Sequence, residues 1–142
     1  MSVAEEIRDN FSKMFPSESF QVIQASNYCV SSFNGELLLK VKLEDGNYLL
    51  VLKMRVSDGP KISNDEVFQK AFPWVYESKK TPDVDRRRDF LKENISNLFP
   101  QYHVLVLMFK AGQSWAAPYA KAKANAVFAK DYGDHDIIII LY

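Results

Sequence analysis

The sequence predicts a mixed α/β domain that extends over residues 1–142. Three observations predict it: helical periodicity at the start, two Xaa-Gly dipeptides between alternating apolar stretches, and two unbroken apolar runs towards the end. The expected order is an N-terminal helix, a three-stranded antiparallel meander, two helices and a C-terminal βαβ unit, around a mixed sheet. Hydrophobic residues make up 47% of the chain and charged residues 25%, values typical of globular domains, so wholesale disorder is excluded.

The first helix is predicted from its cap and its periodicity. Ser2 and Glu5 have the spacing of a capping box, in which each side chain satisfies a free backbone N–H group. Val3, Ile7 and Phe11 then recur every four residues, which gives a single apolar stripe. We therefore expect the helix to pack its stripe against the sheet.

The meander is predicted from two turn signals. Asn34-Gly35 and Asp45-Gly46 each suit a two-residue hairpin turn, because type I′ turns need positive φ at both central positions. The expected strands are 28–33, 36–44 and 47–56. In that register Val41 pairs with Leu50, and the apolar side chains of all three strands share one face.

The other face of this predicted meander is our candidate interaction surface. It combines cations with aliphatic side chains, a composition that favours contact with another protein. Its residues are Leu38, Lys40, Lys42, Leu49, Val51, Lys53 and Arg55. Glu36 is expected opposite Arg55 as a cross-strand ion pair. The open alternatives are a sheet face half covered by a helix, and a basic face that binds nucleic acid.

The second half predicts helices and buried strands. Two helices are expected, one over about 63–72, where Ser63 and Glu66 have the spacing of a capping box, and one over 81–99, with a buried stripe of Val84, Leu91, Ile95 and Leu98. The run Arg86, Arg87 and Arg88 in the second helix is expected on a solvated face, within reach of Asp83, Asp85 and Asp89. An apolar strand at 103–109 follows. A helix over 114–132 and a second apolar strand at 135–142 complete a right-handed βαβ unit. Unbroken apolar strands indicate burial on both faces, which is usual for parallel pairs under helices.

Two polar groups in this region are candidate sites. Lys110, Gly112 and Ser114 would join a strand end to a helix N-terminus, a position that favours anions, although no phosphate-binding glycine motif is present. His103 and His135 would start adjacent parallel strands at one edge, where water-bonded strand residues are the simpler interpretation than a metal site. We predict no metal, no cofactor and no catalytic residues.

Charge and cysteine content restrict the functional classes. Eighteen basic residues balance eighteen acidic ones, so the basic excess usual in nucleic-acid binders is missing. Cys29 is the only cysteine, which excludes an intramolecular disulfide and favours a reducing, cytoplasmic location. The apolar runs are too short to span a bilayer, so we expect no membrane association.

The order of helix, three antiparallel strands, helix and strand over residues 2–110 resembles the core of PD-(D/E)XK nucleases. That resemblance implies acidic metal ligands on the meander, one of them two residues before a lysine. Here Lys53 follows Val51 at that spacing and Lys42 follows Lys40. The departure falls on the metal ligands themselves, so the resemblance implies an inactive relative that still binds something.

The opening also resembles RWD domains, which are small partner-binding modules. The resemblance covers about 55 residues, through Glu5-Glu6-Ile7, Phe15-Pro16 and the run Phe20-Gln21-Val22-Ile23 ahead of a meander. The tyrosine-proline turn usual after that meander is replaced by Asp58-Gly59-Pro60. What the resemblance implies is an interaction role.

The sequence therefore favours a non-enzymatic protein-interaction domain, of an adaptor or inhibitor type. The alternative is a nucleic-acid-binding or degenerate nuclease-like domain. The expected partner is another protein, with nucleic acid or a second copy of the chain as alternatives, and no membrane.

Overall fold

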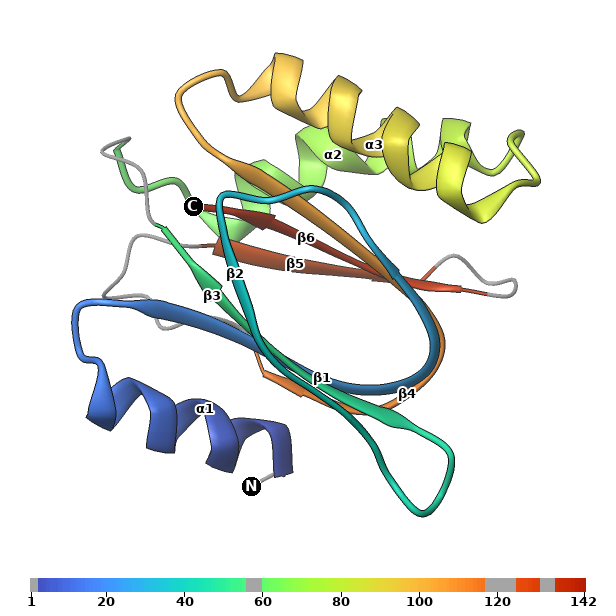
Figure 1. The fold of residues 1–142 in the computed structure, drawn as a ribbon. Helices are drawn as coiled ribbons and strands as arrows, with labels where there is room; N and C mark the ends of the chain where they lie inside the picture. Colours follow the sequence, from blue (N-terminus) through green and yellow to red (C-terminus); the bar gives the residue numbers. More distant parts are fainter. Residues whose placement is uncertain (1–2, 56–59, 117–124, 131–134) are drawn as a thin grey trace.

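The chain combines helices with one curved β-sheet (Figure 1). The structure, a computed structural model, describes residues 3–55, 60–116, 125–130 and 135–142. Its helices are α1 (Val3–Met14), α2 (Asn64–Ser78) and α3 (Val84–Leu98). Its strands are β1 (Ser19–Val30), β2 (Gly35–Lys42), β3 (Tyr48–Met54), β4 (Val104–Ala116), β5 (Asn125–Lys130) and β6 (Asp136–Leu141). The mixed α/β class and the order of helix, strands, two helices and strands are confirmed.

The sheet is built around β1. Strand order is β2-β3-β1-β4-β6-β5, and each neighbouring pair is antiparallel. The first part of β1 pairs with β3, whereas the part from Val22 to Val30 pairs with β4, with an irregularity between Gln24 and Ala25. Such irregularities increase strand twist. Figure 1 shows β1 and β4 curving together along their shared length.

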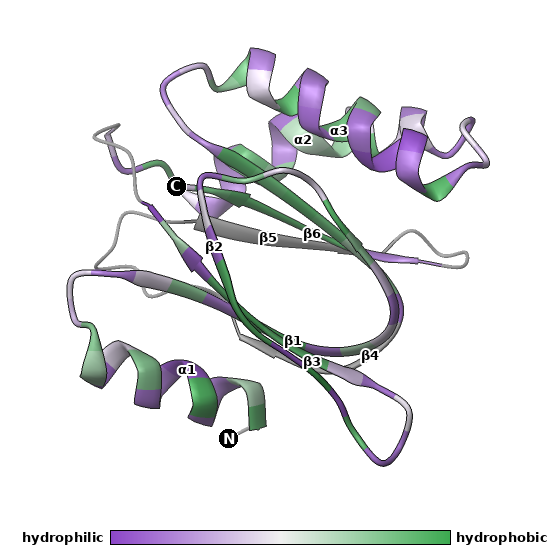
Figure 2. Cartoon of the chain, in the orientation of Figure 1, coloured by the Kyte–Doolittle hydropathy of each residue, from purple (hydrophilic) through white to green (hydrophobic). Residues whose placement is uncertain are grey.

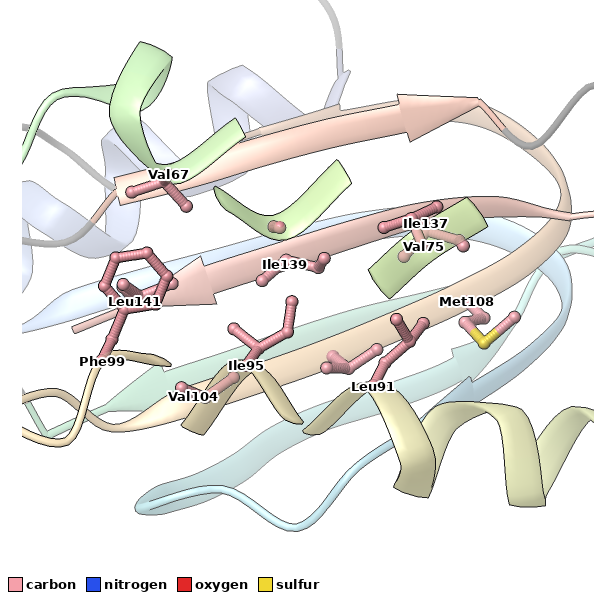
Figure 3. Close-up of a cluster of buried hydrophobic side chains, with 12 residues drawn as sticks. Val67, Val75, Leu91, Ile95, Phe99, Val104, Met108, Ile137, Ile139 and Leu141 are labelled. Atoms are coloured by element: carbon pink, nitrogen blue, oxygen red, sulfur yellow. The ribbon is translucent and has the colours of Figure 1, made fainter. Parts of the chain in front are cut away.

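Helices α2 and α3 cover one face of β4 and β6. Their apolar residues meet alternate residues of the two strands, and in Figure 2 the strands beneath them are green. Figure 3 shows most of this cluster, which consists of Val67, Ala71, Val75, Leu91, Ile95, Phe99, Val104, Val106, Met108, Ile137, Ile139 and Leu141. The predicted apolar stripe of α3 is confirmed at Leu91 and Ile95.

The other residues of β4 and β6 are buried inside the curl of the sheet. Leu105, Leu107 and Ile138 meet Leu50 and Leu52 of β3 there. Helix α1 covers a third cluster, which consists of Ala4, Phe20, Val22 and Val51, with Ile7, Phe11 and Leu49 packed against it. The predicted burial of both faces of the C-terminal strands is thus confirmed, without the parallel pairing that we expected.

The predicted βαβ unit and mixed sheet are wrong. β4 and β6 are antiparallel, and β5 occupies 125–130, where a helix over 114–132 was predicted. Residues 114–116 belong to β4. Residues 117–124 and 131–132 of that predicted helix lie outside the described residues. β5 also pairs with β6 in antiparallel fashion, with Asn125 opposite Leu141 and Lys130 opposite Asp136.

The predicted hairpin at Asn34-Gly35 is also wrong, because β3 lies between β1 and β2. Residues 31–34 connect β1 to β2 and cross from the side of β4 to the end of β3. The Ser31 N–H group donates to Val106 O of β4, and the Arg55 N–H group, just after β3, donates to Asn34 O, both at 2.9 Å. At Gly35 a Cβ atom would lie 2.0 Å from the Lys53 carbonyl oxygen. The glycine therefore serves a close approach of two strands rather than a turn.

The predicted turn at Asp45-Gly46 is in the right place but is wider than two residues. Gly46 has a φ of +88°, and the Leu43 N–H group donates to Asn47 O at 2.8 Å. Lys42, not Leu43, therefore lies opposite Tyr48. This one-residue shift decides which side chains of β2 and β3 share a face, and it overturns the predicted register.

Candidate interaction surface

Strand β2 is an open edge of the sheet. It pairs only with β3, and each of its positions is exposed. Within the residues that the structure describes, no strand lies on its outer side, so a row of N–H and C=O groups faces outward. Such an edge is a template for another extended chain.

Large aliphatic side chains stand on this edge. Leu37 is 49% exposed, Leu38 and Leu39 are each 36% exposed, and Val41 is 39% exposed. Leu39 and Val41 lie opposite Val51 and Leu49, which α1 covers. Leu39 and Val41 therefore extend the apolar surface of β3, which α1 covers, onto the solvent-exposed strand β2.

Two lysines lie on the opposite face of the same strand. Lys40 and Lys42 are opposite Leu50 and Tyr48. The Lys40 Nζ atom lies 5.6 Å from the Tyr28 ring centroid and 5.5 Å from that of Tyr48. A hydrogen bond to the Tyr28 side chain raises the pKa of Lys40, so this lysine remains cationic at neutral pH.

The seven residues of the predicted surface do not share one face. Leu38, Lys40, Lys42 and Arg55 are exposed, whereas Val51 is buried and Leu49 is half-buried against α1. Lys53 pairs with Glu36 at 2.6 Å, so the expected pairing of Glu36 with Arg55 is wrong. The Lys53 ammonium holds the pKa of Glu36 below its ordinary value. The register shift is the cause of both differences.

The residues that this prediction missed are Leu37, Leu39 and Val41, which we had assigned to the buried face. A signal for them was present in the sequence. Three consecutive leucines, 37–39, cannot all point to one face of a regular strand, because successive side chains alternate. The β-bulge between Leu37 and Leu39 is how the strand accommodates them.

The predicted anion site has a different setting from the expected one. Lys110, Gly112 and Ser114 lie within β4, where Gly112 pairs with Ala25 and Ser114 with Gln24 of β1. No helix begins at this point, so the helix N-terminus on which that prediction depended is not there. The cause of the difference is that β4 continues past the position where we placed its end.

The two histidines lie at opposite ends of the β4–β6 pair. His103 exchanges backbone hydrogen bonds with Tyr142, whereas His135 precedes Asp136, which pairs with Phe109. The antiparallel pairing is what separates them. Among the described residues there is no cluster of three or more His, Cys, Asp or Glu side chains able to hold a metal ion.

The arginine run is part surface and part core. Arg88 pairs with Asp85 at 3.3 Å, as the i,i+3 spacing predicts, and with its neighbour Asp89 at 3.0 Å. Arg87 is buried, and its Nε donates to the Ser78 hydroxyl at 3.0 Å. The middle arginine thus ties α3 to the end of α2, which corrects the prediction of a fully solvated run.

Cys29 is packed against the cluster beneath α2 and α3, and burial raises the pKa of its thiol. No helix in the described ranges is long and apolar enough to cross a membrane. No protein-family model, curated protein or solved structure matches the chain.

Proposed function

We propose that this chain is a protein-interaction domain that binds an extended, acidic segment of a partner protein along the outer edge of β2. The observation that carries the proposal is an edge strand exposed along its whole length, with four large aliphatic side chains on it. A strand added to a sheet edge gains main-chain hydrogen bonds, and its alternate side chains meet the two faces of the sheet.

The apolar side of the edge supports an extended occupant. A strand seated beside β2 would place every second side chain next to Leu39 and Val41, which already adjoin Val51 and Leu49. Burying aliphatic side chains of this size stabilises a complex in proportion to the area removed from water. The partner segment is therefore expected to carry aliphatic residues at alternate positions.

The charged side supports an acidic occupant. Lys40 and Lys42 stand two residues apart on one face of β2, opposite residues that carry no charge. Lysines on an edge disfavour pairing with neutral or basic strands, because an ammonium group would lose water without gaining a counter-ion. Glutamate or aspartate at the intervening positions of the partner would supply those counter-ions.

The alternative of nucleic-acid binding has less support from the geometry. Lys53 is engaged by Glu36, and Lys40 and Lys42 share one face of β2, whereas Arg55 follows the end of β3. A nuclease-like metal site would need acidic side chains gathered beside a lysine of the meander. Glu36 lies beside Lys53, but Asp45 is in the turn at the far end of β2 and Glu66 is on α2. We accordingly propose a binding role without catalysis, in the reducing cytoplasm that the single thiol favours.

The test uses two synthetic nine-residue peptides, one that alternates valine with glutamate and one that alternates valine with lysine. Each is titrated into the ¹⁵N-labelled full chain. We expect the acidic peptide to shift the amide signals of residues 35–42, and the basic peptide to leave them unchanged. The double variant K40E/K42E is expected to reverse this preference, because it inverts the charge on that face.

The matched control is Lys61→Glu, which changes an exposed lysine outside the edge strand. It should bind the acidic peptide like the parent chain. Equal binding of both peptides, or shifts centred away from β2, contradicts the proposal. Two further measurements test other occupants of β2. If the chain binds a duplex oligonucleotide and K40E/K42E does not, β2 is a nucleic-acid site. If light scattering shows that the free chain is a dimer and that K40E/K42E is a monomer, β2 is a contact between two copies; either result contradicts the proposal.

A further inference from the structure

A polar pocket lies between α3 and the segment that precedes β2. Its volume is about 420 Å³, within the range of small-molecule sites. Lys92 and Ser96 line it from α3, one turn apart. Asn34 lines it from the residue before β2, His103 from the residue before β4, and Tyr142 from the residue after β6. None of these residues belongs to β2, so this site is independent of the proposed interaction edge.

Lys92 is the only lysine or arginine among the described lining residues, and none of those residues has a carboxylate side chain. Its Nζ atom donates to the Ser32 carbonyl oxygen at 2.5 Å and to the Ser32 hydroxyl group. An ammonium group has three donors, so one is left to point at a ligand. Desolvation lowers the pKa of Lys92, partly offset by the charge of Asp89, and a counter-ion in the pocket would relieve that cost.

Tyr142 supplies a second donor. Its side chain is buried, and its hydroxyl oxygen accepts the Asn34 N–H group at 2.7 Å. Among the described residues the hydroxyl proton has no acceptor, and a buried donor without an acceptor is unfavourable. A ligand oxygen beside this hydroxyl group would remove that penalty.

The remaining polar groups are held in place rather than free to rotate. The Asn34 amide Nδ2 lies 3.1 Å from His103 Nε2, and His103 exchanges backbone hydrogen bonds with Tyr142. Because Lys92 is the one lysine or arginine in the described lining, the pocket matches a ligand with a single negative charge better than a phosphate dianion.

Two aromatic residues, Phe33 and Tyr102, also line the pocket. Aromatic walls favour an apolar or ring-shaped body next to the charged group. We propose that this pocket binds a small organic monocarboxylate with an aromatic body, its carboxylate placed between the Lys92 ammonium and the Tyr142 hydroxyl.

The test titrates phenylacetate, its neutral analogue phenylacetamide and inorganic phosphate into the ¹⁵N-labelled full chain, each to about 20 mM, a range that detects weak ligands. We expect phenylacetate to shift the amide signals of residues 32–34, 92, 96 and 102–104. Phenylacetamide should bind at least about tenfold more weakly, because it cannot form the charge-assisted hydrogen bond. Phosphate should bind more weakly than phenylacetate.

Lys92→Gln should weaken phenylacetate binding at least about tenfold, whereas the matched control Lys61→Gln should leave it unchanged. Tyr142→Phe should weaken it several-fold, with folding of each variant checked by circular dichroism. The K40E/K42E chain should retain the pocket, which separates this result from the fate of the edge proposal. Absence of saturable shifts, equal binding of the amide, tighter binding of phosphate, or undiminished binding by a folded K92Q chain overturns the proposal.

Discussion

Tyr142 offers a test of how the loop before β2 is held to the end of β6. Its buried hydroxyl oxygen accepts the Asn34 N–H group at 2.7 Å, and burial raises the pKa of Tyr142 from 10.0 to about 12. Replacing it with phenylalanine removes the acceptor but keeps the ring. At neutral pH we expect Tyr142→Phe to lower the free energy of unfolding by about 1 kcal/mol, the usual net value of one hydrogen bond.

The difference in the free energy of unfolding between the parent and Tyr142→Phe chains should also depend on pH, and this dependence tests the raised pKa of Tyr142 directly. Below pH 10 the hydroxyl group is protonated in both folded and unfolded chains, and the tyrosine contributes no slope. Between pH 10 and about 12 the unfolded chain loses this proton while the folded chain keeps it, so parent stability falls as pH rises. Two pKa units correspond to about 2.7 kcal/mol, and discounting for water in the adjoining pocket leaves about 1–2 kcal/mol.

Urea denaturation of both chains between pH 7 and pH 12 measures this difference. Other tyrosines and lysines titrate alike in the two proteins, so subtraction isolates Tyr142. The parent should be more stable at pH 7, and its advantage should vanish or reverse towards pH 12. Tyr76→Phe, at a residue that is 63% exposed, serves as the control and should show no such trend. A difference that stays constant across the alkaline range would refute the reasoning.

The other predictions concern the core, a buried bridge and one close approach. Leu91→Ala should lower the free energy of unfolding by about 3 kcal/mol in chemical denaturation, because Leu91 is fully buried on the face of α3 that packs against β4 and β6. Ser78→Ala should cost about 2 kcal/mol by the same measurement, because the Arg87 guanidinium would lose a buried acceptor at 3.0 Å. Gly35→Ala should speed amide hydrogen exchange in β2 while leaving β4 protected, since its Cβ atom would collide with Lys53 O. Unchanged exchange in β2 would count against the assigned approach.

Local patterns predicted much of this fold. The capping spacing of Ser63 and Glu66 is confirmed, with the Glu66 N–H group donating to Ser63 Oγ at 3.2 Å. The apolar stripe of α3 and the two-sided burial of β4 and β6 also followed from periodicity and from unbroken apolar runs. These features depend on residues close in sequence or on composition alone, so one segment contains all the information needed.

Pairing could not be predicted in the same way. A glycine that serves a close approach at residue 35 carries the same dipeptide signal as a hairpin turn, and only the position of β3 distinguishes them. The turn at Gly46 is one residue wider than the dipeptide implies, which changed the register of β2 and with it the candidate surface. The candidate pocket was missed because Asn34, Lys92 and Tyr142 come together only through the tertiary fold.

The position of β1 has a consequence for how the chain reaches its native state. Both hydrogen-bonded neighbours of this strand come later in the sequence, and β4 begins only at Val104. A ribosome therefore releases β1 long before its second partner exists, and the nascent segment exposes Ile23 and its apolar neighbours meanwhile. Folding should be slow and late, since distant contacts must close first, and an N-terminal fragment made alone should aggregate.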